Sequence, residues 1–168
     1  MMELSDFEVI EIKNTWKIPM ADPSGSGQAI LLKFFERYPH NKLKFQDFKD
    51  QSLDQLKTCP KFKAHASRIV RTFNEAINVL GTDYTDPALH EIFSKVAISH
   101  HKRGISKASY NELKEVILEI VVAVCEMNDC QKCAWEKLME TIYELISRPL
   151  IALKSEVGFL NILKFVCN

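Results

Sequence analysis

His100 closes an apolar stripe on a predicted helix, and its imidazole is the first side chain in this sequence that could do chemistry. At about 100° per residue, the members of the stripe point within about 60° of one another. They are Leu89, Phe93, Val96 and His100. An imidazole on such a stripe is either a hydrogen-bonded core histidine or a ligand for a group held inside the core. The residue types alone leave both interpretations open.

A second histidine, His65, lies on another amphipathic segment, which begins at Pro60 and ends near Gly81. The apolar residues of this segment share an arc of about 100°, and His65 sits at its edge, about 40° from Ile69. Arg68 follows about 60° further towards solvent. This order of apolar wall, imidazole and cation suits the mouth of a core pocket, and it equally suits an ordinary surface histidine and arginine.

Phe45 and Phe48 stand in the stretch 39–59, which keeps no sustained period and is predicted to be a short helical turn, an ordered corner and a brief helix capped by Ser52. Two phenylalanines are too bulky for a solvated loop. They either anchor the corner to the core or clamp a planar ligand from the rim.

The remaining segments predict an all-helical domain over residues 1–153, because glycine and proline are scarce and separate stretches of helical period. Gly25 and Gly27 are costly inside or near a helix, and either a close helix crossing at one of them or a frayed first turn would explain their presence. Residues 154–168 form an apolar tail of unknown role. Helix starts are expected at Ser5, Asp22, Pro60, Asp86, Ser106 and Asp129, with ends at Pro19, Pro39, Gly81, Arg103 and near Pro149.

The composition excludes several classes of function. The 168 residues suit one domain, and 22 basic residues balance 22 acidic ones, so no net field favours nucleic acid as a partner. We expect neither a signal peptide nor a membrane span. Five cysteines, an odd number, favour reduced thiols and a cytoplasmic setting. Cys130 and Cys133 form a CxxC without the further ligands of a zinc site or the preceding strand of a redox motif.

The two histidines could face each other across a helical core, with apolar walls between the two helices. A bare zinc ion would need four ligands, and carboxylates are missing from both faces. A flat, largely apolar metal complex needs an axial imidazole, aromatic and aliphatic walls, and cations at the mouth for its carboxylates. Haem has these properties, and histidine is one of its standard ligands. The walls would be Phe45, Ile69, Phe93, Val96 and Ile105.

The chain resembles the globin family, most of all the intracellular globins of insects. Trp16, the run Phe35–Pro39 and the corner Phe45–Phe48 resemble the first-half signatures of that family. The segments Phe62–Ala66 and Val96–His100 resemble its distal and proximal histidine regions. The match covers roughly residues 5–153 in the right order and implies seven to eight helices around haem b.

This resemblance implies a role for particular residues. His100 would be the proximal iron ligand, and His65 the distal histidine and a potential sixth ligand. Phe45 would wedge the haem at the corner, where Phe48 lies beside it. Leu31 and Ile69 would be the distal walls, and the remaining cofactor contacts would be Arg68, Phe93, Val96, Arg103 and Ile105, with the two arginines meeting propionates.

Reversible dioxygen binding, for storage, transport or facilitated diffusion, is the expected function, with dioxygen and other diatomic gases as ligands and no enzymatic activity. We expect a monomer or weak homodimer. One alternative is haem-based redox chemistry or sensing, such as scavenging of nitric oxide or peroxide, which would need a separate reductase. Another is a helical interaction module without haem. Whether His65 itself binds iron at rest is left open by the residue types.

Overall fold

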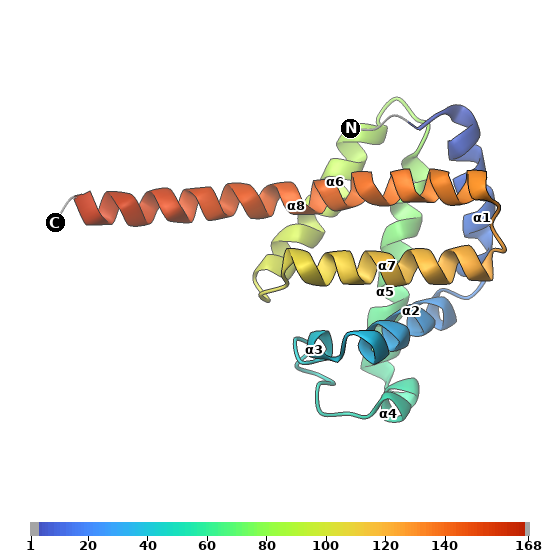
Figure 1. Cartoon of the computed structure of the whole chain (residues 1–168), viewed down its shortest axis with the longest axis horizontal. Coiled ribbons are helices and arrows are strands. Elements are labelled where there is room, and N and C mark those ends of the chain that lie inside the picture. The colour runs from blue at the N-terminus through green and yellow to red at the C-terminus, as the bar shows by residue number, and fades with distance from the viewer. Residues whose placement is uncertain (1–3, 167–168) are drawn as a thin grey trace.

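The computed structural model describes the backbone of residues 4–166 and the side chains of residues 4–147. Its described part is all α-helical, with eight helices and no strand, as the sequence predicts (Figure 1). The helices are α1 (Asp6–Ala21), α2 (Pro23–Arg37), α3 (Pro39–Lys42), α4 (Leu53–Thr58), α5 (Pro60–Val79), α6 (Thr85–His101), α7 (Lys107–Val124) and α8 (Asp129–Val166). None of the described helices is long and apolar enough to cross a membrane.

Most helix starts follow from local capping, as expected. Ser5 forms a capping box with Glu8 at the start of α1, and Ser52 forms one at the start of α4. Asp22 caps α2 directly before Pro23, and Ser106 caps α7. These caps use side chains within three residues of the helix start, which is why the sequence alone reveals them.

The expected end of the first helix at Pro19 is wrong, because α1 continues to Ala21. Proline has no N–H, so the carbonyl of Thr15, four residues earlier, loses its usual helical donor. The thiol of Cys125 donates to that carbonyl instead, with Sγ 3.4 Å from the oxygen. A distant part of the chain therefore satisfies the group that Pro19 leaves free.

Two other predicted boundaries also change. The helix that carries His100 begins at Thr85 rather than Asp86, and the Thr85 hydroxyl donates to the Val79 carbonyl at the end of α5. The last helix does not end near Pro149, since α8 stays helical to Val166 and runs past the other helices in Figure 1. The side chains of the predicted tail at 154–168 lie outside the described residues, so its role stays a prediction.

Two apolar clusters form the interior. The larger one contains Trp16 and Trp135, whose ring centroids lie 5.6 Å apart. The smaller one contains Phe35, Phe48 and Phe62 and lies under the corner between α2 and α4. Ile69, Leu113 and Ile120 pack against both clusters. The apolar arc predicted for the segment that begins at Pro60 is therefore the face that α5 turns to the core.

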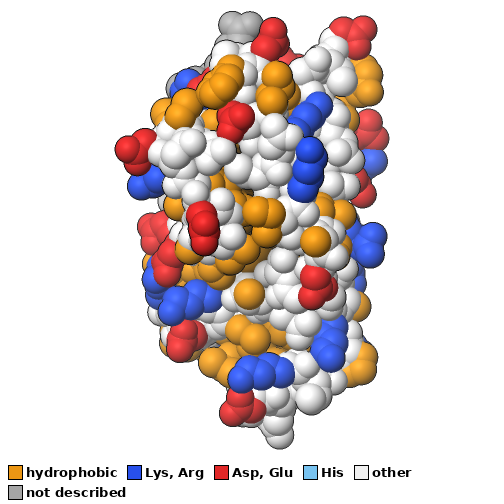
Figure 2. Space-filling model, turned by 90° about the vertical axis from the view of Figure 1, so that its right-hand side faces the viewer, with side chains coloured by type: hydrophobic (Ala, Val, Ile, Leu, Met, Phe, Trp, Pro, Cys, Tyr) orange, Lys and Arg blue, Asp and Glu red, His pale blue; other side chains and the backbone are white. Residues whose placement is uncertain are grey.

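The outer surface carries both signs of charge. On the face shown in Figure 2, which is the side where α1 lies in Figure 1, Lys and Arg side chains alternate with Asp and Glu ones and with scattered apolar groups. No patch of one sign dominates this view, in keeping with equal numbers of basic and acidic residues in the chain.

Gly27 brings α2 into direct backbone contact with α5. A Cβ atom added at Gly27 would lie 2.1 Å from the carbonyl oxygen of Ala66, closer than any side chain can approach. This confirms the close helix crossing that a glycine at this position suggests. Ala66 directly follows His65 in the sequence, so the crossing also fixes the position of His65 in the fold.

Gly27→Val should destabilise the protein by about 1–3 kcal/mol or more, because the added atoms meet backbone rather than a movable side chain. The free energy of unfolding in urea measures the effect. The neighbouring substitution Gln28→Ala, which adds no atom to the crossing, serves as the control. A Gly27→Val protein of unchanged stability would show that the two helices can separate freely.

Candidate functional site

His100 is held in one ring orientation by its own helix. Its Nδ1 lies 2.8 Å from the carbonyl oxygen of Val96, which can only accept, so Nδ1 carries the proton and donates. The other ring nitrogen, Nε2, is then the one left for a ligand. The ring is half-buried and lies 5.9 Å from the ring of Tyr110. Burial lowers the pKa of His100, although the bond to Val96 partly opposes this shift.

His65 is half-buried on α5, against the aromatic corner. The ring of Phe45 meets it edge-on at 5.3 Å, and the ring of Phe48 lies at 6.4 Å. Burial, followed by the nearby charges of Arg68, His100 and Arg103, lowers the pKa of His65 to about 4. The imidazole is therefore uncharged at neutral pH.

His65 and His100 lie near enough for their charges to interact. A charge on His100 influences the pKa of His65, although one residue is on α5 and the other on α6. Arg68 and Arg103 are exposed at the rim and act on the same imidazole. Arg103 donates to the backbone carbonyl of Ser99 at 2.9 Å. The order of wall, imidazole and cation predicted from the sequence is the order found in the fold.

The predicted wall residues divide between the two apolar clusters. Leu31 and Phe48 are buried in the smaller cluster, and Ile69 bridges the two. Val96 and Ile105 are partly buried against the larger cluster. Phe93 is buried more deeply than Val96 and Ile105, and its ring lies 6.4 Å from the ring of Phe73 in the core. Phe45 thus has a ring contact with a histidine, whereas the ring contact of Phe93 lies within the larger cluster.

Tyr110 is a site residue that the sequence analysis missed. Its hydroxyl is buried and has no hydrogen-bond partner among the described residues, and burial raises the pKa of this phenol. A buried donor normally finds an acceptor, so an unpaired one beside His100 indicates a ligand-binding position. The available signal was a polar-tipped aromatic on the inward face of α7, four residues after its cap.

These groups fit haem. Two neutral imidazoles can serve as axial ligands, the aromatic corner can contact a planar ring, and the hydroxyl of Tyr110 and the two rim arginines can meet polar groups. Within the described residues, no three histidine, cysteine or acidic side chains gather as a bare metal ion would require. The four described cysteines, Cys59, Cys125, Cys130 and Cys133, are unpaired.

The globin family model matches residues 28–146. The chain belongs to the globin family. A globin of Drosophila melanogaster is 45% identical, with a TM-score of 0.84 over 86% of this chain and 94% of that one. The haemoglobin of the botfly Gasterophilus intestinalis is 32% identical, with a TM-score of 0.80 over 86% of this chain and 97% of the other. Globin CTT-Z of Chironomus thummi piger is 27% identical over 89% of both chains.

Family membership and the fit of the site together establish haem b as the cofactor of this globin. The resemblance to insect globins drawn from the sequence is confirmed by these relatives. A helical module without haem, one of the alternatives above, is set aside on the same grounds.

The buried His65 should make the haem-free protein sensitive to acid. Its pKa is about 4 in the folded chain and about 6.5 when unfolded, so the unfolded state binds more protons between these values. The free energy of unfolding should therefore fall as the pH drops from 6.5 towards 4, by at most about 3 kcal/mol. Urea unfolding at pH 7 and pH 4.5 tests this. His65→Leu should weaken the dependence, and full retention would show that this imidazole is not desolvated.

Proposed function

We propose that this globin binds dioxygen reversibly, with His100 as the proximal iron ligand and His65 as the distal histidine. One observation carries the proposal. Two uncharged, half-buried imidazoles on α5 and α6 lie within electrostatic reach of each other, and the hydrogen bond to Val96 leaves Nε2 of His100 available. Iron ligation requires a neutral imidazole, so the burial that lowers both pKa values favours it.

Haem supplies a ferrous iron that can bind a diatomic gas reversibly. The donation from His100 Nδ1 to the Val96 carbonyl fixes the tautomer and the ring plane, and it makes Nε2 a better donor to a metal. Phe93, Val96 and Ile105 support this side of the site. Arg68 and Arg103 can pair with carboxylates, since both are exposed and near enough to His65 for their charges to lower its pKa.

On the other side, His65 remains uncharged at neutral pH and keeps one N–H to donate to a polar guest. Phe45 and Phe48 limit how its ring can turn. Leu31 and Ile69, which pack in and against the smaller cluster, would supply the apolar surface that keeps water from a bound gas. This combination stabilises a bound gas by a hydrogen bond while protecting it from solvent.

We further propose that His65 occupies the sixth position of iron until a gas displaces it. The support is the likeness to a Drosophila melanogaster protein described as a hexa-coordinate haemoglobin, at 45% identity with a TM-score of 0.83. The aromatic corner against His65 is the local feature that would hold the imidazole ready.

The proposed activity is binding rather than turnover. Sustained redox scavenging would need an electron donor, so storage or facilitated diffusion requires fewer components. We propose residues 1–153 as the functional domain. Unpaired cysteines at the four described positions suit a reducing compartment such as the cytoplasm.

His100→Ala should abolish the axial spectrum of the loaded protein and weaken haem retention, because no other imidazole lies on the inward stripe of α6. Visible spectra of the oxidised, reduced and carbon monoxide forms measure this. The adjacent variant His101→Ala should keep the wild-type spectrum. Should His100→Ala keep an identical axial spectrum, His100 is not the proximal ligand.

His65→Leu should convert the ferrous, unliganded protein from a low-spin to a high-spin spectrum. It should also speed dioxygen release by about 10- to 100-fold, since a buried hydrogen bond of about 1–3 kcal/mol is lost. Stopped-flow displacement of dioxygen by carbon monoxide gives the rate. Lys63→Leu, an exposed position on the same helix, is the control. An unchanged release rate removes His65 from this role.

A further inference from the structure

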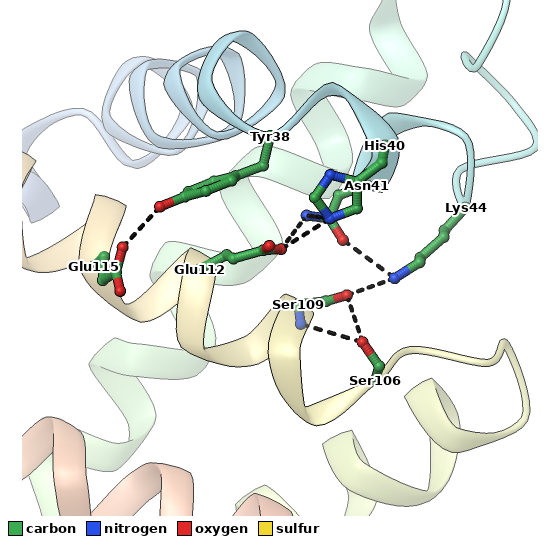
Figure 3. A network of polar contacts seen from close by, with 8 residues as sticks. All are labelled: Tyr38, His40, Asn41, Lys44, Ser106, Ser109, Glu112 and Glu115. Carbon is green, nitrogen blue, oxygen red and sulfur yellow. Dashed lines mark hydrogen bonds and ion pairs between the residues drawn. The ribbon is translucent and has the colours of Figure 1, made fainter.

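A network of polar side chains fastens the corner after α2 to the first turns of α7 (Figure 3). Tyr38 donates to Glu115 at 2.7 Å, and Asn41 donates to Glu112 at 2.7 Å. His40 also contacts Glu112, at 3.1 Å. The network thus ties together two segments that lie about 70 residues apart in the sequence.

The innermost bond of this network joins Lys44 to Ser109. The Lys44 ammonium donates to the Ser109 hydroxyl oxygen at 2.5 Å and to the side-chain oxygen of Asn41 at 3.2 Å. Ser109 is 4% exposed and Asn41 is 1% exposed. The hydroxyl of Ser106 lies 3.0 Å from that of Ser109 and extends the network by one hydrogen bond. The Lys44 ammonium therefore donates charge-assisted hydrogen bonds to two residues that are themselves buried.

Each partner of this bond is followed directly by a ring that contacts one of the two histidines. Phe45 follows Lys44 and meets His65 edge-on at 5.3 Å. Tyr110 follows Ser109 and lies 5.9 Å from His100. The Lys44–Ser109 bond therefore connects the two sides of the haem site through one residue at each end.

We propose that the Lys44–Ser109 bond is a strut that positions Phe45 relative to Tyr110, and so sets how readily His65 reaches the iron. This rests on the function proposed above. Lys44 and Ser109 are positioning residues: they act through the two aromatic rings and need not touch haem or gas.

Phe45 is the ring through which the strut acts on His65. The ring is half-buried and stands in a corner without regular helix, where its position depends on the contacts of neighbouring residues such as Lys44. With the strut in place, its edge limits the orientations open to the imidazole. Without the strut, the imidazole gains freedom that it must lose again on binding iron, so the ligated state becomes less populated.

Two substitutions remove the strut without removing the fold. Lys44→Met keeps the length of the side chain and loses its charge. Ser109→Ala loses the hydroxyl, but the backbone N–H of Ser109 still donates to the Ser106 oxygen at 3.2 Å, so the cap of α7 survives. Glu140→Gln is the matched control, because it breaks the ion pair between Lys114 of α7 and α8 without involving the corner.

The haem-loaded variants are compared by the low-spin fraction of the ferrous, unliganded spectrum and by the rate of carbon monoxide binding after a flash. Each strut variant should lower the equilibrium constant for His65 ligation by about threefold to tenfold and speed carbon monoxide binding accordingly. The double variant should do no more than either single one, since both remove the same bond. Glu140→Gln should match the wild type, and thermal unfolding records any general loss of stability.

The same substitutions in the His65→Leu background separate the two proposals. There, Lys44→Met should leave carbon monoxide binding unchanged, because the residue through which it acts is gone. The strut is overturned if the single variants stay within about twofold of the wild type, if their effects add, or if Lys44→Met still acts without His65. If His65→Leu itself leaves the wild-type spectrum unchanged, the proposed ligation of iron by His65 fails, and the strut falls with it. Reversible dioxygen binding is judged separately, by the dioxygen release rate of His65→Leu.

Discussion

The backbone contact between α2 and α5 at Gly27 is the constraint on which the rest of the molecule depends. A Cβ atom at Gly27 would overlap the carbonyl oxygen of Ala66, so the two helices approach more closely than side chains would allow. The contact fixes α5 at Ala66, the residue after His65, and it sets the direction in which α2 leads to Tyr38 and the corner beyond it. Because backbone atoms make the contact, it cannot yield by a change of rotamer, so both the distal side of the haem site and the polar network start from one rigid point.

Desolvation of His65 and His100 is the second constraint on the site. The apolar walls that could hold a haem also take water away from His65 and His100, and this lowers both pKa values. A neutral imidazole can bind iron or donate one hydrogen bond, whereas a protonated one cannot bind a metal. Cations at the rim act in the same direction, since Arg68 and Arg103 disfavour a further positive charge nearby. The arginines that could pair with haem carboxylates thus also help to keep the two histidines uncharged.

The two sides of the site are built differently. His100 is fixed within its own helix by the carbonyl of Val96, so its orientation needs no distant partner. His65 has ring contacts with Phe45 and Phe48, which stand in a corner without regular helix. The corner that carries these rings is held to α7 by a few polar bonds, which can be altered one at a time.

Local signals in the sequence were enough for the all-helical class, the capped helix starts and the inward stripes that carry His65 and His100, because caps and helical period depend on residues within a few positions of one another. The passage of α1 through Pro19, the unpaired hydroxyl of Tyr110 and the bond between Lys44 and Ser109 could not be found in that way. Each depends on a partner or an environment supplied by residues far away in the chain. Chain neighbours fix which residues share a helix face, but the contacts between faces arise when the helices cross, and no periodic pattern encodes them.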